Sequence, residues 1–331
     1  MKKVLACLFS AVLMVVATAC FTLKEPARAQ ASTEIRLAHV VNEEDSFHIA
    51  AMKFKEIVEE RTDGEISISI YPNAQLGDER NLLEGMRMGT VDMGVITNGP
   101  VANFVEEIAV FELPFLFPSR EDAYDILDGP IGSELLDNLE RVNLKGLAYA
   151  ERGFRNLTNS KRPVHTPEDV SGLKIRVMEN PVYIDTFRAL GANAVPMAWT
   201  EALTAMRQGT IDGQENPVNV IHAFKLDEQQ DYLSMTRHTY APAIFVMGQM
   251  NWQGLSPEQQ EIFVEAAQEA SEHARQVNFE MEEEQLQELQ DRGMQVIEEP
   301  DLEAFRSEVH SVYDKYGDDF GEYLERILDE L

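Results

Sequence analysis

The hydrophobic pattern of residues 34–97 predicts an alternation of strands and helices. An apolar strand over Glu34–Val40 comes first, and a helix over Ser46–Thr62 follows it, with apolar side chains at helical spacing. Isoleucine alternates with serine over Ile66–Ile70, as in a half-buried strand. A helix over Asp78–Met88 then leads into a third strand over Val91–Thr97. Strands that alternate with helices indicate a parallel sheet with helices on its faces.

Seven residues of this region recur later in the chain. Met86–Asp92 reads Met-Arg-Met-Gly-Thr-Val-Asp, and Met206–Asp212 reads Met-Arg-Gln-Gly-Thr-Ile-Asp. Each copy is predicted to be a helix end, a glycine able to adopt the left-handed cap conformation, and a strand start. Helix–glycine–strand is a common local pattern, yet agreement at five of seven positions favours a second, similar lobe. The elements predicted around the second copy are a strand over Leu173–Val177, helices over Pro181–Leu190 and Thr200–Gln208, and a strand over Thr210–Gln214.

A long helical segment follows Trp252. Its start, Ser256–Gln259, combines a capping box with proline at the first helical position, and Gly293 marks its end. A single helix of this length would extend for about 50 Å, enough to brace two lobes. Two helices separated by a kink fit the same pattern.

The first 29 residues have the layout of an export signal. Lys2 and Lys3 precede an apolar run, and Pro26–Ala29 offers a small-x-small cleavage site. The apolar run is short for a membrane span, and no second one follows. Ala17–Cys20 is a degenerate lipobox, so a lipid-anchored form through Cys20 is an alternative. We expect residues 1–29 to be a signal peptide and the protein to be periplasmic.

Composition then excludes several classes of protein. Both cysteines, Cys7 and Cys20, lie in the predicted signal, so the mature chain would have no disulfide and no thiolate site. The chain has 28 basic and 58 acidic residues, and removing residues 1–29 leaves 24 and 57, a net charge of −33. This acidity argues against nucleic acid or an anionic membrane as a partner. No Gly-x-Ser-x-Gly, His-Glu-x-x-His or phosphate-loop motif occurs, so no catalytic site or cofactor is expected.

The seven histidines show no spacing typical of metal ligands. His39, His48 and His238 are interpreted as scaffold residues, and no metal is expected. Carboxylates are so abundant that any pair of them could be chosen as acid and base, which makes such a pair uninformative.

Polar residues gather where the predicted strands end. Ligands of parallel α/β sheets bind beyond the carboxyl ends of the strands. The first-lobe strand ends at Thr97 and Asn98, and the second-lobe strand runs into Gln214–Pro217. Their amides and hydroxyl suit an oxygen-rich ligand, although Asn-Gly-Pro and Asn-Pro are also ordinary turn sequences.

Arg176 is the sharper candidate. In the predicted strand Leu173–Val177, the apolar residues share one face, whereas Lys174 and Arg176 share the other. A half-exposed strand would leave both cations in solvent, but strands of parallel sheets are usually covered on both faces. A covered arginine needs a carboxylate partner, from the protein or from a ligand. Arg155 is a second candidate donor.

At these residues the sequence resembles the DctP-type substrate-binding proteins of tripartite ATP-independent periplasmic (TRAP) transporters. The resemblance covers essentially the whole mature chain. It is carried by Ala74-Gln75-Leu76-Gly77-Asp78, Leu113-Pro114-Phe115-Leu116-Phe117, Gly172-Leu173-Lys174-Ile175-Arg176-Val177 and Asp212-Gly213-Gln214-Glu215-Asn216-Pro217.

The resemblance implies an α/β fold of the two-lobed periplasmic binding protein type, with a ligand cleft between the lobes and a long C-terminal helix bridging them. Lobe one would comprise residues 33–153 and 242–281, and lobe two residues 154–241 and 282–331, joined by crossing strands. The loop Val41–Phe47 matches the first lobe-one loop at the cleft, where no single residue is assigned.

The resemblance also implies roles for six residues. Arg176 would grip the ligand carboxylate through a two-pronged salt bridge, because a planar guanidinium matches a carboxylate as lysine cannot. The other implied ligand contacts are Arg155 as a second cation, Asn216 as an amide, Trp199 as an aromatic that packs on the ligand, and Thr97 and Asn98 in a segment that varies with substrate.

The function implied is the capture of a small organic acid for delivery to TRAP membrane subunits, by a protein that is not an enzyme and that we expect to be a monomer. Because no third arginine is evident, we expect a hydroxylated monocarboxylate, a sugar acid, in preference to a C4-dicarboxylate. Other carboxylates and sulfonates remain open as ligands. A binding protein for an ABC importer or a chemoreceptor would share the fold, and a periplasmic enzyme would need acid–base groups in the cleft.

Overall fold

The computed structural model describes residues 33–331, and within them contacts join the chain into one compact unit. The predicted signal peptide, its cleavage site, Cys7 and Cys20 lie outside the described residues. Within the described part, no helix combines the length and apolar character needed to cross a bilayer.

The first half of the fold confirms the predicted alternation to within two residues. Strands β1 (Thr33–Ala38), β2 (Ile66–Tyr71) and β3 (Met93–Thr97) are parallel, with β1 in the middle. Helices α1 (Ser46–Arg61) and α2 (Glu79–Met88) connect them, as the apolar spacing predicted. These strands therefore direct their carboxyl ends toward one edge of the sheet.

The second half repeats this arrangement around β5 (Lys174–Val177), which lies parallel to both β6 (Asn193–Pro196) and β7 (Gly213–Asn216). Its helices are α7 (Pro181–Ala189) and α8 (Trp199–Arg207). Strand β7 begins three residues later than predicted.

The repeated glycines perform the predicted function at both places. Gly89 and Gly209 follow α2 and α8 with φ angles of 74° and 65°, in the left-handed region that glycine adopts without a steric cost. The internal echo thus marks the same turn in each half of the molecule.

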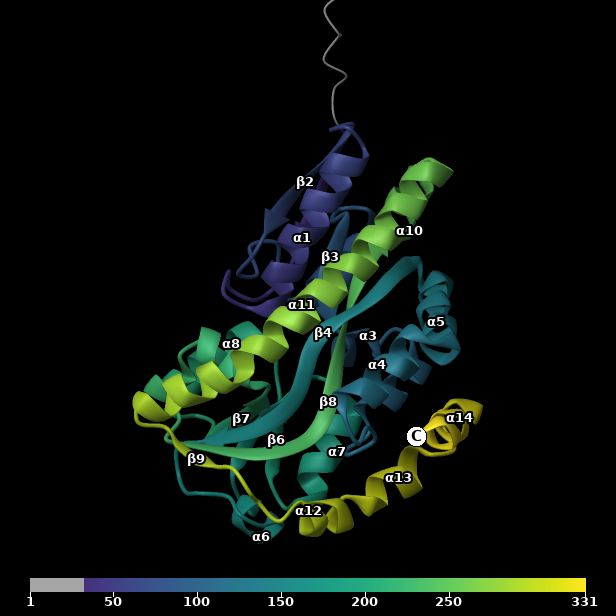
Figure 1. Ribbon diagram of the computed structural model, residues 1–331. Helices are drawn as coiled ribbons and strands as arrows, with labels where there is room; N and C mark the ends of the chain where they lie inside the picture. The colour runs from purple at the N-terminus through teal and green to yellow at the C-terminus, as the bar shows by residue number, and fades with distance from the viewer. Residues whose placement is uncertain (1–32) are drawn as a thin grey trace, which may run out of the picture. The chain divides into compact units, whose positions relative to one another are not determined.

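Two long strands cross between the halves (Figure 1). Strands β4 (Leu144–Asn159) and β8 (Tyr232–Gly248) are antiparallel to each other, β8 also pairs with β3, and β4 also pairs with β7. Hydrogen bonds consequently join the strands into one sheet. Its strand order is β2-β1-β3-β8-β4-β7-β5-β6, and β9 (Gln295–Ile297) pairs with β8. The β4–β8 register shifts three times, twice in the middle of the crossing, between Glu151 and Gly153 and between Arg155 and Leu157.

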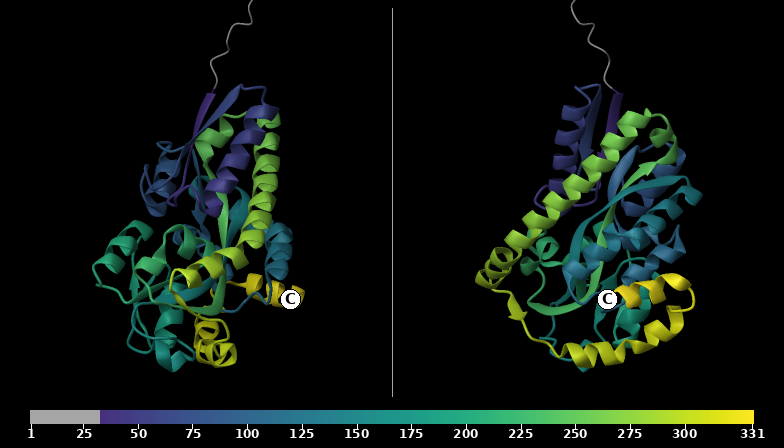
Figure 2. Two further views of the ribbon diagram at one scale, coloured as in Figure 1. Left: turned by 60° about the vertical axis from the view of Figure 1, so that its left-hand side comes forward. Right: turned by 45° about the vertical axis from the view of Figure 1, so that its right-hand side comes forward.

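The chain has the predicted two-lobed architecture, and α11 (Pro257–Asp291) bridges the lobes as one continuous helix. Figure 2 shows it running diagonally along the molecule. Ser256 and Gln259 form the predicted capping box. In its first half, Glu269 binds Arg61 at the end of α1, and near its end Glu288 lies 2.8 Å from His222 of α9 (Val218–Ala223). The kinked alternative is therefore excluded.

The predicted lobe boundaries stay a prediction. The last helix, α14 (Glu322–Glu330), touches lobe one, where Arg326 binds Glu134.

The remaining helical elements are α3 (Asn98–Val101), η1 (Glu106–Glu112), α4 (Arg120–Asp128), α5 (Pro130–Asp137), η2 (Asn138–Val142), α6 (Pro167–Val170), η3 (Leu226–Glu228), α10 (Gln249–Gln253), α12 (Leu302–Glu308) and α13 (His310–Tyr316).

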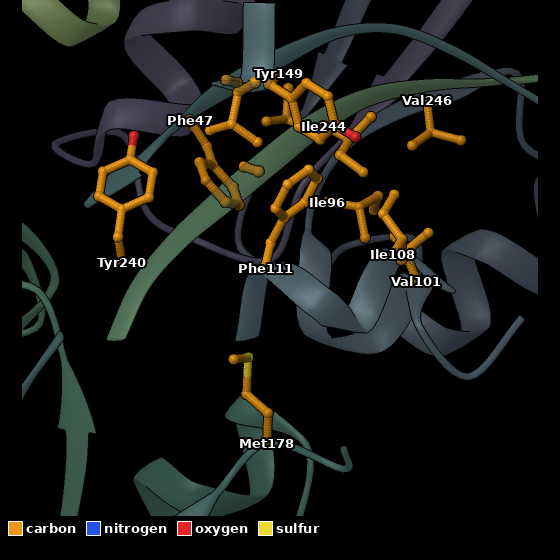
Figure 3. Packing of buried hydrophobic residues seen from close by; sticks show 14 of the residues in the cluster. Phe47, Ile96, Val101, Ile108, Phe111, Tyr149, Met178, Tyr240, Ile244 and Val246 are labelled. Atoms are coloured by element: carbon orange, nitrogen blue, oxygen red, sulfur yellow. The ribbon is translucent and has the colours of Figure 1, made fainter. Parts of the chain in front are cut away.

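The apolar core continues from lobe one toward lobe two. Figure 3 shows Phe111 of η1 beside Tyr149 of β4, with the two rings edge to face at 5.6 Å, among branched side chains such as Ile244 of β8. Met178, directly after β5, is buried against Gly99, where a Cβ atom would lie 2.9 Å from its Cε. The two lobes are thus in close contact at the carboxyl ends of their strands.

Candidate functional site

A pocket of about 460 Å³ opens at this contact between the lobes. Lobe one contributes the start of α2 and the segment after β3, and lobe two contributes the ends of β5 and β6 and the start of α8. The residues in its wall include Val40, Glu79, Pro100, Arg176, Met178 and Trp199. The pocket therefore lies where the strand directions predicted a ligand site.

Arg176 lies in this wall as a buried cation without a carboxylate partner. It is 4% exposed, whereas Lys174 on the same strand is exposed, so the arginine is covered as predicted. Its Nε and Nη2 lie 3.0 and 2.7 Å from the Met197 carbonyl oxygen. Within residues 33–331, no Asp or Glu lies within ion-pair distance of Arg176, and its Nη1 makes no hydrogen bond. Burial lowers the pKa of Arg176 to about 10, even though more distant carboxylates favour the charged form.

An unpaired buried guanidinium is costly unless an anion joins it. The Met197 carbonyl orients the side chain, and the unused Nη1 remains available to a carboxylate. The structure thereby gives Arg176 the properties of an anion-binding group.

Trp199 lies beside this arginine at the start of α8. The Arg176 guanidinium carbon is 5.5 Å from the centre of the indole ring, which itself packs edge to face on Phe224 at 5.1 Å. The indole Nε1 is buried and has no hydrogen-bond partner in the described part of the chain. Trp199 thus contributes an aromatic side chain to the pocket wall, and its buried Nε1 donor is unused.

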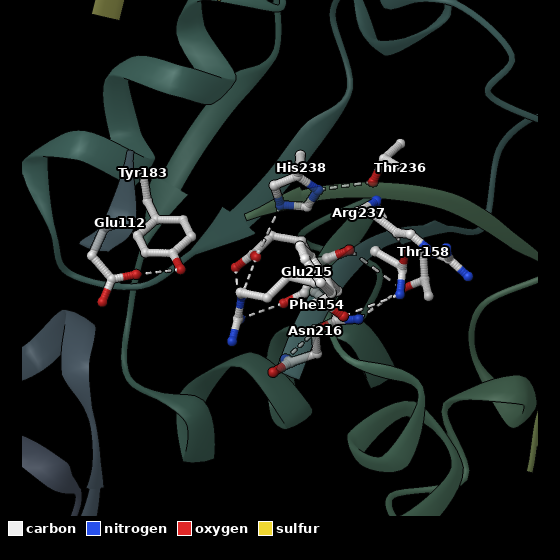
Figure 4. A network of polar contacts seen from close by, with 12 residues as sticks. Glu112, Phe154, Thr158, Tyr183, Glu215, Asn216, Thr236, Arg237 and His238 are labelled. Carbon is white, nitrogen blue, oxygen red and sulfur yellow. Dashed lines mark hydrogen bonds and ion pairs between the residues drawn. The ribbon is translucent and has the colours of Figure 1, made fainter. Parts of the chain in front are cut away.

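Arg155 has a partner of its own. It is fully buried on β4, where its Nε contacts Glu215 Oε2 and its Nη2 lies 2.8 Å from Glu215 Oε1. Figure 4 shows Glu215 also close to His238, whose Nε2 lies 3.3 Å away. Burial by itself would raise the pKa of Glu215. The charge of Arg155, together with the hydrogen bonds of Glu215 with His238 and Arg155, instead holds this pKa at about 2.

The ion pair leaves one part of Arg155 free. Its Nη1 is buried and has no hydrogen-bond partner among residues 33–331. The predicted second cation is therefore a scaffold residue at Nε and Nη2, and Arg155 is not among the residues that line the pocket.

Glu79 faces Arg176 from the lobe-one side of the pocket. It is half-buried at the first position of α2, and its Oε1 accepts a hydrogen bond of 2.7 Å from the Thr97 amide. Burial raises the pKa of Glu79, while that hydrogen bond and the charges of Arg152 and Arg176 act in the opposite direction. An acidic side chain thus stands opposite the anion-binding arginine, a residue that the sequence analysis missed.

The polar residues after β3 and on β7 are buried and bonded within the protein. Asn98 is 0% exposed, and its Nδ2 donates to the Ile108 carbonyl at 3.0 Å and to Glu112 at 2.7 Å. Asn216 is buried on β7, and its Nδ2 donates to Gln214 Oε1 at 2.5 Å. The Asn98 Oδ1 has no partner in the described chain. Thr97, Asn98 and Asn216 are not among the residues that line the pocket, so their predicted ligand contacts stay a prediction.

The loop Val41–Phe47 contacts lobe two. Asn42 Nδ2 lies 2.7 Å from the Ala223 carbonyl oxygen, and Asn219 Nδ2 lies 3.0 Å from Ser46 Oγ. The buried Asp45 carboxylate caps α1 and lies 3.0 Å from Arg152 Nη1. The loop therefore fixes the lobes against each other in this structure.

Within residues 33–331, no group of three potential metal ligands forms, around the histidines or elsewhere. His39 Nε2 lies 3.1 Å from His48 Nδ1, and burial lowers the pKa of His39 to about 3. His238 Nδ1 lies 2.8 Å from Thr236 Oγ1.

Comparisons with known proteins match the chain over nearly its whole described length. The DctP model of bacterial extracellular solute-binding proteins, family 7, matches residues 37–319. The chain is similar to the 2,3-diketo-L-gulonate-binding periplasmic protein of Escherichia coli (strain K12), with 38% identity over 275 residues, 83% of this chain and 84% of that protein.

Two crystal structures are similar in fold as well as sequence, each with a TM-score of 0.88. One is a TRAP periplasmic solute-binding protein from Polaromonas sp. JS666 bound to D-erythronate, at 37% identity over 89% of this chain and 98% of that one. The other is the sugar acid binding protein from Advenella mimigardefordensis strain DPN7T in complex with galactonate. Its sequence identity is 33%, and the match covers 90% of this chain and 97% of that one.

Proposed function

This chain belongs to family 7 of the bacterial extracellular solute-binding proteins, and we propose on that basis that its ligand is a monocarboxylic sugar acid. It is a TRAP-type solute-binding protein, which captures a small organic acid and works with the TRAP membrane subunits. The related proteins described above bind D-erythronate, galactonate and 2,3-diketo-L-gulonate, all of them sugar acids.

The observation that carries the proposal is a difference in hydrogen-bonding character across the pocket. Lobe two presents the Arg176 guanidinium, whose Nη1 is a free donor, with Trp199 beside it. Lobe one presents the Glu79 carboxylate as an acceptor. Arg80 and Arg87 also lie in this wall, where Arg80 bonds Glu84 and Arg87 bonds the Val142 carbonyl oxygen. A ligand that fits both walls has a carboxylate at one end and hydroxyl donors at the other.

A C4-dicarboxylate would fit this pocket less well. If one carboxylate pairs with Arg176, the other approaches Glu79, and two like charges at close range repel each other. A hydroxyl in that place can donate to Glu79. Arg176, Arg155, Asn216, Trp199, Thr97 and Asn98 are the ligand-binding residues in this proposal, with Glu79 added to them.

A thermal-shift screen of residues 30–331 tests the proposal, because a ligand that binds only the folded state raises its melting temperature. We expect D-galactonate, D-erythronate or D-glucuronate to raise it, and succinate and malate to have little effect. Calorimetry that finds succinate or malate bound far more tightly than any aldonate or uronate would contradict the proposal.

We propose two finer points in addition. The protein releases its ligand unchanged, which NMR spectra of the ligand after long incubation with the protein would check. Export removes residues 1–29, so the periplasmic protein has a mass that corresponds to a start at Gln30. A start at a lipid-modified Cys20 would instead support the lipid-anchored form.

A further inference from the structure

Packing rather than hydrogen bonding orients the indole of Trp199 in the pocket wall. Trp199 is the first residue of α8 and is 6% exposed. A buried indole nitrogen usually donates a hydrogen bond, yet Nε1 of Trp199 has no partner within residues 33–331. The orientation of this ring therefore depends on the side chains that pack against it.

Two side chains from lobe two pack on the indole. The Arg176 guanidinium carbon lies 5.5 Å from the ring centre, close enough for a cation–π attraction. The Phe224 ring packs edge to face, with 5.1 Å between the ring centres and 86° between the ring planes. Aromatic pairs in this geometry stabilise each other beyond the area that they bury. Phe224 is not among the residues that line the pocket, so Trp199 is the path by which its ring can reach a ligand.

The backbone that carries Phe224 is fixed by contacts that do not involve the phenyl ring. Phe224 directly follows α9, and the carbonyl groups at a helix end lack donors from their own helix. The Ala223 carbonyl oxygen instead lies 2.7 Å from Asn42 Nδ2 of the lobe-one loop. Two residues before Phe224, His222 lies 2.8 Å from Glu288 of α11. A smaller side chain at position 224 should therefore leave this turn in place and remove only the support of the indole.

We infer that Phe224 is a positioning residue for ligand binding: its ring holds the Trp199 indole beside Arg176. The Arg176 guanidinium is then fixed by this indole and by the Met197 carbonyl oxygen. The inference rests on the proposed function, in which Arg176 binds the ligand carboxylate. A guanidinium that is already ordered loses less side-chain freedom when the ligand binds, and affinity rises without a contact between Phe224 and the ligand.

A double-mutant cycle with D-galactonate as the probe tests the inference by calorimetry. We expect Phe224→Ala to weaken binding about fivefold, the effect of one aromatic pair. In a Trp199→Leu background, the same substitution should weaken binding less than about twofold, because no indole is left to hold. Equal losses in the two backgrounds overturn the inference. If Phe224→Ala does not fold, Phe224→Leu keeps most of the apolar volume without the aromatic ring, and the same outcomes apply.

His222→Ala is the matched control on the same helix. It removes the contact with Glu288 of α11 and leaves the ring pair of Phe224 and Trp199 intact. Affinity for D-galactonate should stay within about twofold of the wild type. A loss as large as that in Phe224→Ala would mean that general damage to α9 weakens binding, and this result overturns the inference.

A second measurement needs no ligand. The chain has two tryptophans, and Trp252 of α10 is not among the residues that line the pocket, so a Trp252→Phe background leaves Trp199 as the only indole emitter. In that background, Phe224→Ala should shift the Trp199 emission to longer wavelength and raise its quenching by acrylamide, whereas His222→Ala should change neither. Unchanged emission and quenching in Phe224→Ala overturn the inference whatever the ligand is. If these changes occur but D-galactonate does not bind the wild type, the sugar-acid proposal alone is contradicted.

Discussion

Arg155 and Glu215 form a buried two-point ion pair on adjacent strands, and this pair separates the two arginines of the site. Arg155 Nη2 lies 2.8 Å from Glu215 Oε1, and its Nε contacts Oε2. Arg176 is as deeply buried but is bonded only to a backbone carbonyl. The first arginine already has its counter-charge from the protein, and the second requires one from a ligand.

Replacing Arg176 should therefore affect binding far more than stability. Arg176→Lys keeps the charge but loses one of two parallel hydrogen bonds, which costs about 1.5–3 kcal/mol, or one to two decades in affinity. Arg176→Ala should lose more, since the ligand carboxylate is then buried without a partner. Calorimetry gives the affinity, and melting of the ligand-free protein should change little.

Lys174→Ala is the control for this pair of variants. Lys174 lies on the same strand but is exposed, so neither affinity nor melting temperature should change. An Arg176→Lys protein with wild-type affinity would contradict the role of Arg176. So would a large loss of stability with normal binding, which is the behaviour of an arginine that only braces the sheet.

Glu215→Gln should show the opposite pattern. The variant leaves the Arg155 guanidinium buried without its counter-charge, and breaking a buried pair in this way costs about 3–5 kcal/mol of folding free energy. Urea unfolding of the ligand-free protein measures the loss. Wild-type stability in Glu215→Gln would show that the pair contributes little to the fold.

Glu79→Gln should relax selectivity. The amide removes the negative charge that opposes a second ligand carboxylate and adds a donor, while its oxygen can still accept from the Thr97 amide. We expect the affinity for succinate to rise about tenfold relative to the affinity for D-galactonate, which corresponds to about 1.4 kcal/mol of binding free energy. If the ratio of the two affinities stays constant, Glu79 does not face the variable end of the ligand.

Glu112 makes stability depend on pH. Burial raises its pKa from 4.5 to about 7, although hydrogen bonds from Tyr183 and Asn98 and the charge of Arg155 act against this, and Glu215 adds to it. Between these values the folded state binds more protons than the unfolded state, so stability falls as pH rises from about 4.5 to 7 and then levels off.

Glu112→Gln lacks this dependence. Its stability relative to the wild type should therefore increase between pH 5 and pH 8, by at most about 3 kcal/mol. Urea unfolding of both proteins at the two pH values measures the difference. A difference that stays constant over this range would show that Glu112 does not titrate there.

Local patterns were sufficient to predict most of the fold and the central residue of the site. The repeated helix–glycine–strand turn predicted both halves, because only glycine adopts its φ angle without a steric cost. Arg176 was found from strand alternation combined with the rule that parallel sheets are covered on both faces.

The partners of the site residues could not be found in this way. Glu215 pairs with Arg155 through the register of β7 on β4, which depends on tertiary pairing, and 58 acidic residues offered no means to single it out. Glu112 ends a 3₁₀ helix whose short length leaves no periodic signal, and its two contacts join segments 14 and 71 residues away. Such contacts depend on how lobes approach each other, which one-dimensional patterns do not encode.

The crossing strands have a consequence for how the protein melts. Because β4 and β8 contribute backbone hydrogen bonds to both lobes, neither lobe retains a complete sheet when the other unravels. Thermal denaturation should therefore be a single cooperative transition rather than two successive ones. A fragment that contains only one lobe, however it is cut from the gene, would expose an unpaired β edge prone to aggregation. The two halves of the molecule should therefore fold and unfold as one.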